Sequence, residues 1–219
     1  MTPRLIFLVG PPGAGKTTHG LKLAQEFGFK PIESSALVRR AMVANPQLKK
    51  VKEDYNTGQL FPGDWTTGLL KGELKNLIGT DQAVVLSGAL RTLYEVKHII
   101  PYIIENFGLE NIKIIHLDIG LAEAVRRNSS RRVCEKSAHP LPDGPEFKDL
   151  KICPLDQSPI VRRKMDQPEI IQKRFENYLT QTRPAIEVIE KISPLTVFYL
   201  DGERPVAVVY RELKDNLEL

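Results

Sequence analysis

The segment Gly10-Pro11-Pro12-Gly13-Ala14-Gly15-Lys16-Thr17 is the most informative part of this sequence. It matches the pattern G-x-x-x-x-G-K-[ST], and it lies between the apolar run 5–9 and a stretch of helical character. Glycines let consecutive backbone N–H groups curl around a phosphate, and the helix that follows adds the positive end of its dipole. In such a loop the Lys16 ammonium reaches the β- and γ-phosphates, and the Thr17 hydroxyl can ligate Mg²⁺. The motif predicts binding of a nucleoside triphosphate with Mg²⁺, but it does not identify the group that receives the phosphate.

Short apolar runs recur along the chain, with helical stretches between them. The runs are 4–9, 83–86, 112–117 and 195–200, with 29–32 as a short fifth. Continuously apolar strands that end in polar turns are typical of a parallel sheet covered by helices on both faces. The expected helices are 16–27, 35–44, 65–78, 93–106, 122–128, 168–192 and 205–219, and Pro184 should kink or split the longest. We therefore predict an α/β protein of the P-loop NTPase fold, with a five-stranded parallel sheet and helices on both faces.

Length and composition exclude several classes of protein. The chain has 219 residues, of which 42% are hydrophobic and 26% charged, and its net charge is +4 at pH 7. These values are ordinary for a soluble globular protein, and no apolar run approaches the roughly 20 residues that span a bilayer. The N-terminal apolar run is too short for a signal peptide. We therefore expect a cytoplasmic protein without a membrane or nucleic-acid partner, in which Cys134 and Cys153 are free thiols or metal ligands.

Arginines gather in the second half of the chain. They are Arg126, Arg127, Arg131, Arg132, Arg162, Arg163 and Arg174. A solvated basic face is the usual meaning of such a run, but guanidinium groups also pair with phosphate oxygens two at a time. The stretch 132–164 within this region is rich in Pro, Asp, Lys and Gly. A loop of that length in a compact domain is usually a functional lid or disordered.

Several motifs stand in the order found in adenylate kinases. They are the segment 10–18, Ser34-Ser35 with Arg40, Gly88 with Arg91-Thr92, Arg131-Arg132, Arg163-Lys164 with Asp166 and Arg174, and Asp201-Gly202 with Pro205-Val206. On these residues the chain resembles the adenylate kinases and related nucleoside monophosphate kinases over nearly its whole length. The resemblance implies a P-loop core of residues 1–33, 65–130 and 165–219. It also implies two mobile insertions, of which 34–64 binds the nucleoside monophosphate (NMP) and 131–164 is the LID that closes over the triphosphate.

The resemblance implies an activity as well. The expected reaction is transfer of the γ-phosphate of Mg·ATP to AMP, which gives two ADP, by a monomeric enzyme. One alternative is a kinase of the same fold that acts on GMP, CMP or UMP. Another is a nucleotide-binding protein without turnover. The presence of Lys16 favours an enzyme, because binding alone would not require it together with six matching arginines, which are Arg40, Arg91, Arg127, Arg131, Arg163 and Arg174.

The resemblance assigns roles by matched position. The catalytic residues would be Lys16, Arg91, Arg127, Arg163 and Arg174. Those that bind ATP would be Gly10, Pro12, Gly13, Ala14, Gly15, Lys16, Thr17, Thr18, Arg127, Arg131 and Arg204. Those that bind the monophosphate would be Ser35, Arg40, Gly88, Arg91, Glu95, Arg163 and Arg174.

The sequence departs from the family pattern at the end of the predicted strand 83–86. The family usually has Asp-Gly-Phe-Pro-Arg where this chain has residues 87–91, and Ser87 replaces the aspartate that organises the water shell of Mg²⁺. Asp118, at the end of the next strand, is a candidate substitute, although a purely structural role for it is the favoured interpretation.

The acceptor side departs as well, because the family has Gln where this chain has Glu95. An ionised carboxylate only accepts hydrogen bonds, so it suits the amino group of adenine or cytosine, and the two adjacent donors of guanine better still. We therefore hypothesise a pocket relaxed or shifted away from strict AMP. The alternative is that Glu95 is a surface residue of its helix.

Some lids of this family hold Zn²⁺ between two Cys-x-x-Cys or Cys-x-x-Asp pairs. The matching positions here are Cys134, Ser137, Cys153 and Asp156. Ser137 is a poor zinc ligand, and His139 is close enough in sequence to take its place. The alternative is a hydrogen-bonded polar cluster without metal.

Overall fold

Residues 4–45, 47–48, 53, 57–136, 139, 141, 149–154, 156–192 and 195–219 are described by the structure, which is a computed structural model. The expectations for residues 1–3, for Ser137 and for parts of the two insertions lie outside the described residues.

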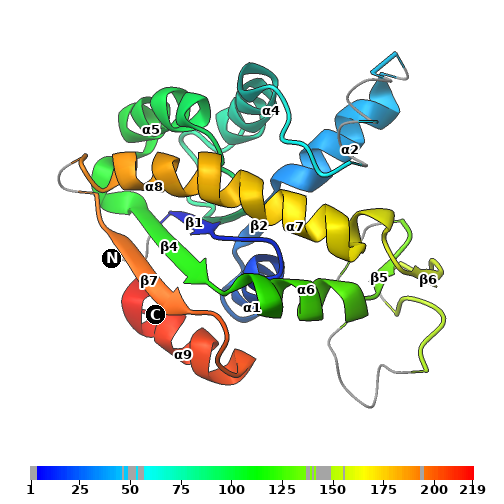
Figure 1. Cartoon of the computed structure of the whole chain (residues 1–219). Coiled ribbons are helices and arrows are strands. Elements are labelled where there is room, and N and C mark those ends of the chain that lie inside the picture. The colour runs from blue at the N-terminus through cyan, green and yellow to red at the C-terminus, as the bar shows by residue number, and fades with distance from the viewer. Residues whose placement is uncertain are drawn as a thin grey trace.

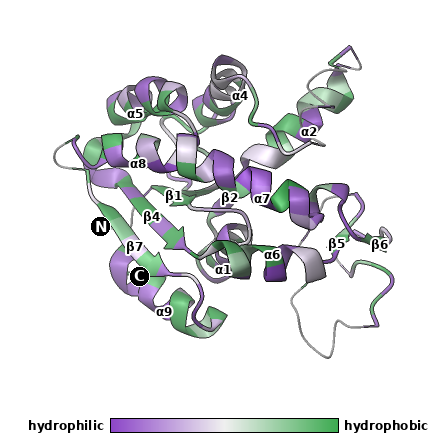
Figure 2. Ribbon diagram, in the orientation of Figure 1, coloured by the Kyte–Doolittle hydropathy of each residue, from purple (hydrophilic) through white to green (hydrophobic). Residues whose placement is uncertain are grey.

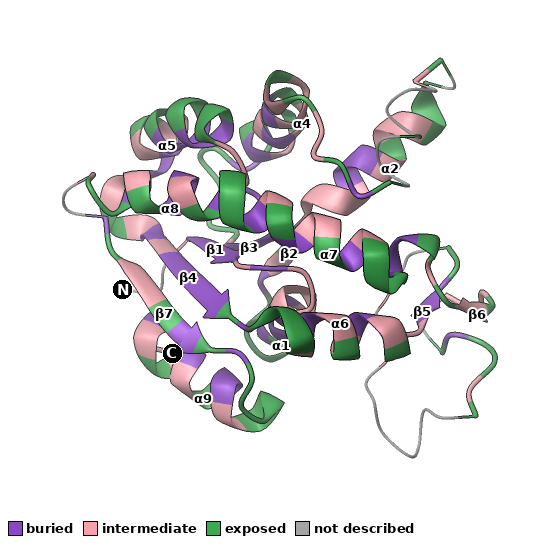
Figure 3. Cartoon of the chain, viewed as in Figure 1, coloured by how far each residue is buried: buried purple, intermediate pink, exposed green. Residues whose placement is uncertain are grey.

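A five-stranded sheet with the order β2-β3-β1-β4-β7 forms the centre of the molecule, and all of its neighbouring strands are parallel (Figure 1). The strands are β1 (Leu5–Val9), β2 (Lys30–Glu33), β3 (Val84–Ser87), β4 (Ile112–Asp118) and β7 (Val197–Asp201). Burial is almost complete in β1, β3 and β4 (Figure 3). The predicted strands are therefore confirmed, with ends that differ by a residue or two.

Helices cover both faces of the sheet. They are α1 (Lys16–Phe27), α2 (Ser34–Ala44), α4 (Gly63–Lys75), α5 (Leu93–Phe107), α6 (Leu121–Ser130), α7 (Pro168–Asn177), α8 (Arg183–Ile189) and α9 (Val206–Leu217). In Figure 1, α4, α5 and α8 lie above the sheet, and α1 and α9 lie below it. None of the helices in the described part of the chain is long and apolar enough to cross a membrane.

The alternation of side chains along β1 divides the core into two. Leu5 and Phe7 face the cluster that contains α4, α5 and α8, whereas Ile6 and Leu8 face the cluster that contains α1 and α9. A strand that is apolar on both faces has to be covered on both faces, and Figure 2 shows hydrophobic residues throughout β1. The three-layer arrangement follows from this pattern.

The long helix expected over 168–192 is divided into α7 and α8 directly before Pro184, which confirms that this proline splits it. After α7 comes a π-helical turn, Tyr178–Thr182, in which the Arg183 N–H donates to the Tyr178 carbonyl. Pro184 has no N–H to offer to the preceding turn, and its ring excludes the carbonyl that would lie beneath it. The helical turn contains one extra residue there, and α8 then continues in nearly the same direction (Figure 1). We call residues 178–182 the π-turn.

The region 131–164 has little regular structure among its described residues. A short antiparallel pair, β5 (Val133–Cys134) and β6 (Ile160–Val161), joins its two ends, and Ile152 forms an isolated bridge with Pro159. Figure 1 shows this pair at one end of the molecule, on the same side as the far end of α2. Both segments expected to be insertions therefore lie away from the centre of the sheet.

Candidate nucleotide-binding site

The loop between β1 and α1 has a backbone conformation that strongly favours glycine. Gly10 has a φ of +133°, and a Cβ there would collide with the Leu117 carbonyl oxygen on β4. Gly13 and Gly15 have φ values of +86°, and Gly15 caps the N-terminus of α1. The loop therefore takes the phosphate-binding form that its sequence predicts, at the carboxyl edge of the sheet.

Lys16 lies at the start of α1 and folds back over the loop. Its ammonium donates to the carbonyls of Gly10 and Pro11, at 2.8 and 2.6 Å. Burial lowers the pKa of Lys16 well below its usual value, and the nearby Arg91, Arg174 and Arg131 lower the pKa further. A negatively charged ligand bound here would stabilise the charged form of Lys16.

A cleft of about 1430 Å³ opens above the loop and is bounded by α2, α4, α6, α7 and the π-turn. The cations that line it are Lys16, Lys22, Arg39, Arg91, Arg126, Arg127, Arg131, Arg132, Arg162, Arg163, Arg174 and Arg204. Among its described lining residues the carboxylates are Glu33 and Glu95. Such an excess of positive charge suits a ligand with several phosphates.

Asp166 holds two of these arginines in place, and sequence reasoning did not name it as a site residue. Its carboxylate accepts two hydrogen bonds from Arg131, at 3.0 and 2.5 Å, and lies 3.5 Å from Arg174 Nη1. Only 4% of its side chain is exposed. Burial and then the charges of Arg131 and Arg163 lower the pKa of Arg174 to about 9. One carboxylate thus faces several cations, and the group as a whole stays electropositive.

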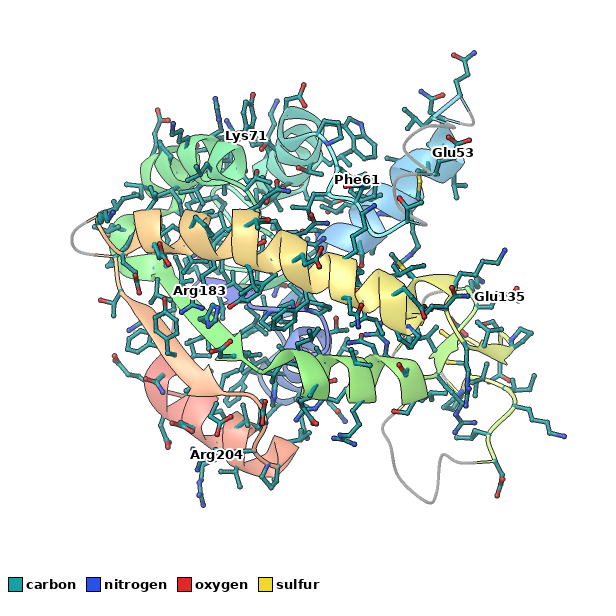
Figure 4. All side chains as sticks on the ribbon, in the orientation of Figure 1. Glu53, Phe61, Lys71, Glu135, Arg183 and Arg204 are labelled. Carbon is teal, nitrogen blue, oxygen red and sulfur yellow. The ribbon has the colours of Figure 1, made fainter. Side chains whose placement is uncertain are left out.

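Arg127 connects the loop to the opposite wall of the cleft. Its guanidinium pairs with Glu123 one turn earlier and donates to the carbonyls of Gly13 and Glu203. Arg204, labelled in Figure 4 beside α9, lines the cleft but is half exposed and pairs with Glu212. Both residues are therefore on the side of the cleft where the sequence predicts ATP.

Arg40 is not placed at the cleft, which differs from the prediction. It lies on the exposed face of α2 and pairs with Glu73 of α4 at 2.5 Å. Arg39 lines the cleft instead, and its guanidinium donates to Ser35 Oγ one turn earlier. Successive residues of a helix point about 100° apart, so only one of two adjacent arginines can face the cleft. The four-residue spacing between Ser35 and Arg39 was the feature of the sequence that could have identified Arg39 as the arginine at the cleft.

Glu95 is buried and lines the cleft, so the alternative that it is a surface residue is wrong. Its carboxylate accepts from Thr66 Oγ1 and from the Arg91 N–H, each at 2.7 Å. Its own N–H donates to the Thr92 hydroxyl, which caps α5. The residue therefore connects α4, α5 and the loop that carries Arg91.

Ser87 and Asp118 end the two strands next to β1. The Ser87 hydroxyl donates to the Lys16 carbonyl at 3.3 Å, so it faces α1. Asp118 is not among the described residues that line the cleft, and it accepts from the Tyr178 hydroxyl at 3.5 Å. This agrees with the structural interpretation of Asp118 and gives no support to its use as a substitute for the missing carboxylate.

Cys134, His139, Cys153 and Asp156 converge in the described part of the region 131–164. Their potential ligand atoms all lie within 4.8 Å of one another. Cys134 Sγ is 3.1 Å from Asp156 Oδ2 and 3.4 Å from His139 Nδ1, which is 3.7 Å from Cys153 Sγ. The two thiols are buried and form no disulfide. The residues that the sequence singled out are thus brought together, with His139 among them.

A phosphate-binding loop at the carboxyl edge of a parallel sheet, opposite a buried group of arginines, defines a P-loop nucleotide-binding protein built for phosphoryl transfer. The adenylate kinase family model matches residues 8–193. The chain is 31% identical to the adenylate kinase of Kosmotoga olearia over 97% of its own length and 98% of that protein. It is 30% identical to the adenylate kinase of Thermosipho africanus, over 95% and 96% of the two chains. The adenylate kinase of Archaeoglobus fulgidus is 28% identical, over 98% and 97% of the two chains. The chain belongs to the adenylate kinase family.

Proposed function

We propose that this protein transfers the γ-phosphate of Mg·ATP to AMP and so produces two molecules of ADP. The observation that carries the proposal is the position of Lys16, Arg131 and Arg174 around one cleft that reaches from the P-loop to α2. A transferring phosphoryl group needs its two partners held in line and its charge neutralised, which these residues are suited to do. Family membership supports the same reaction.

Two sides of the cleft would hold the two nucleotides. On the donor side, the backbone of residues 10–15 with Lys16, Thr17 and Thr18 would bind the triphosphate, and Arg127 and Arg204 would border its tail. On the acceptor side, Ser35, Arg39, Gly88 and Arg91 would hold the monophosphate. Arg131, Arg163 and Arg174 would neutralise the charge that builds between the two.

The residues of this site fit a Mg²⁺ ion that enters bound to the nucleotide. Thr17 lines the cleft at the first turn of α1 and would supply one hydroxyl ligand, while Ser87 next to it carries no charge. Mg²⁺ keeps several waters and binds phosphate oxygens readily, so few protein ligands are needed. When bound, the ion would add positive charge between the β- and γ-phosphates.

The segments 34–64 and 131–164 would be the moving parts of the enzyme. Both contribute residues to the cleft, such as Arg39 from the first and Arg132 from the second. Their closure would exclude water, so that phosphate passes to AMP rather than to a water molecule.

We also propose a cytoplasmic monomer that needs neither membrane nor nucleic acid. The residues assigned to the donor and to the acceptor nucleotide line one cleft of this chain, which supports a function carried out by a single copy. The two cysteines are free, as is usual for a protein kept in a reducing compartment.

Diphosphate formation with Mg·ATP and AMP, GMP, CMP or UMP separately tests the proposed reaction. We expect kcat/KM for AMP to exceed that for each of the others by about tenfold or more, a result that would overturn the hypothesis of a pocket relaxed or shifted away from strict AMP. The Glu95 carboxylate can still accept the adenine amino group, because each oxygen has a second lone pair. Preference for another monophosphate would favour the same fold with a different acceptor. ATP binding without turnover would favour a non-catalytic protein.

The cluster Cys134, His139, Cys153 and Asp156 is proposed to hold one Zn²⁺. Tetrahedral zinc with Zn–S bonds of about 2.3 Å sets its ligands about 3.3–3.8 Å apart. The donor separations of 3.1, 3.4 and 3.7 Å are close to that range, and two thiols with a histidine suit zinc. The ion would tie β5 to the loop around residue 153 and so stiffen the lid.

Elemental analysis after purification in zinc-replete medium tests this site. We expect about one zinc per chain in the wild type and well below one in Cys153→Ser, with a lower Tm for the variant. Lys151→Ala, an exposed change nearby, should keep both the zinc and the Tm. Well below one zinc per chain in the wild type would show that the cluster is held by hydrogen bonds alone.

A further inference from the structure

The loop that carries Arg91 is held in an unfavourable backbone conformation. Gly88 has a φ of +77°, which glycine tolerates, but Leu90 has a φ of +59° and is fully buried. A branched, bulky residue seldom takes the left-handed region, because its Cβ crowds the following carbonyl. Such a conformation persists only where the surrounding structure holds it, and it often marks a functional site.

Two hydrogen bonds hold the backbone of Arg91 from opposite sides. Its N–H donates to Glu95 Oε2 at 2.7 Å, and its carbonyl accepts from Thr182 Oγ1 at 3.0 Å. The other Glu95 oxygen is held by Thr66 of α4. Residues from α4, α5 and the π-turn therefore meet around the backbone of this one residue, whose side chain lines the cleft.

The π-turn explains why Thr182 reaches a distant residue. A threonine inside a helix usually donates to the carbonyl four residues earlier, as exposed Thr180 does with Glu176 at 2.8 Å. Thr182 is only 6% exposed, lines the cleft and donates across to Arg91 instead. The wide turn before Pro184 thus presents one buried hydroxyl to the Arg91 loop.

We infer that Thr182 and Glu95 are positioning residues that hold the Arg91 backbone so that its guanidinium faces the phosphate of the nucleoside monophosphate. This inference rests on the proposed function, because it needs a monophosphate on the acceptor side of the cleft. It adds the π-turn to the acceptor site, although the turn follows α7 and lies far from α2 along the chain. In this inference the Glu95 carboxylate acts first by supporting the loop that carries Arg91.

Thr182→Val tests the inference, because valine keeps the shape of threonine and removes the hydroxyl. We expect KM for AMP to rise about five- to tenfold, while KM for ATP changes less than about twofold. Thr182→Ser should restore most of the affinity for AMP. Thr180→Val is the matched control on the same turn and should leave both constants unchanged.

Calorimetric titration of AMP into wild type and Thr182→Val, at a temperature below both Tm values, separates this inference from the proposed reaction. Weaker binding of AMP to the variant supports the inference even if turnover of AMP is absent. Equal affinity, or an equal rise in KM for both nucleotides, overturns the inference and leaves the proposed reaction standing. No AMP binding by the wild type overturns both.

Discussion

Lys16→Met will reduce kcat/KM for phosphoryl transfer by a factor of about 10³ or more. Methionine keeps most of the length of the side chain and removes its charge. Lys16 Nζ lies over the P-loop, held by the carbonyls of Gly10 and Pro11, where the phosphates of ATP would replace those contacts. A charge that acts on the transferring group is worth far more than one that only attracts the substrate, because it is preorganised in a site closed to water. Steady-state ADP formation with saturating AMP measures the effect.

Stability separates this catalytic effect from unfolding. Burial and neighbouring arginines lower the pKa of Lys16, so its charged form is disfavoured in the protein without nucleotide. The Tm of Lys16→Met in the absence of nucleotide should therefore equal or exceed that of the wild type. Lys97→Met, an exposed change on α5, should leave both activity and Tm unchanged. A Lys16→Met variant that retains more than about a tenth of the activity would contradict the assigned role.

Asp166→Asn will lower both the stability and the activity of the protein. The carboxylate is buried and carries two hydrogen bonds from Arg131, with Arg174 at 3.5 Å. Removing one partner from a buried ion pair costs about 3–5 kcal/mol, because the remaining charges are left uncompensated. For a chain of this size we expect the Tm to fall by roughly 6–20 °C. Thermal unfolding measured by circular dichroism tests the value.

Nucleotide should offset part of that loss. The phosphates of Mg·ATP supply the negative charge that Asp166 no longer provides, so the Tm of Asp166→Asn should rise more on ATP addition than that of the wild type. Glu73→Gln removes a carboxylate from a surface pair with Arg40 and is the matched control. Its effect should stay within about 1 kcal/mol, as for other exposed pairs. An Asp166→Asn effect as small as that of Glu73→Gln would mean that the arginines are positioned without the carboxylate.

The sequence-based predictions agree with the structure where the residues of a short stretch restrict the conformation of that same stretch. The apolar run 5–9 has no polar face, so it had to be a strand covered on both sides. Gly10 and Gly13 occupy backbone conformations that side chains rarely adopt, so the phosphate-binding loop was predictable from residue type and spacing alone. The ordered set of motifs, from the segment 10–18 to Asp201-Gly202, likewise predicted the family from residue type and order.

Residue order along the chain was therefore sufficient to predict the sheet, the P-loop and the class of ligand, because hydrophobic alternation and glycine spacing are local properties. Packing in three dimensions, by contrast, placed Arg39 rather than Arg40 at the cleft and brought Asp166 to Arg131. It also decided that Thr182 supports Arg91. Each of these depends on the angle at which one element meets another that is distant in the chain. The packing of these elements determines which partner a side chain meets across a cleft, and no periodicity along the chain predicts that partner.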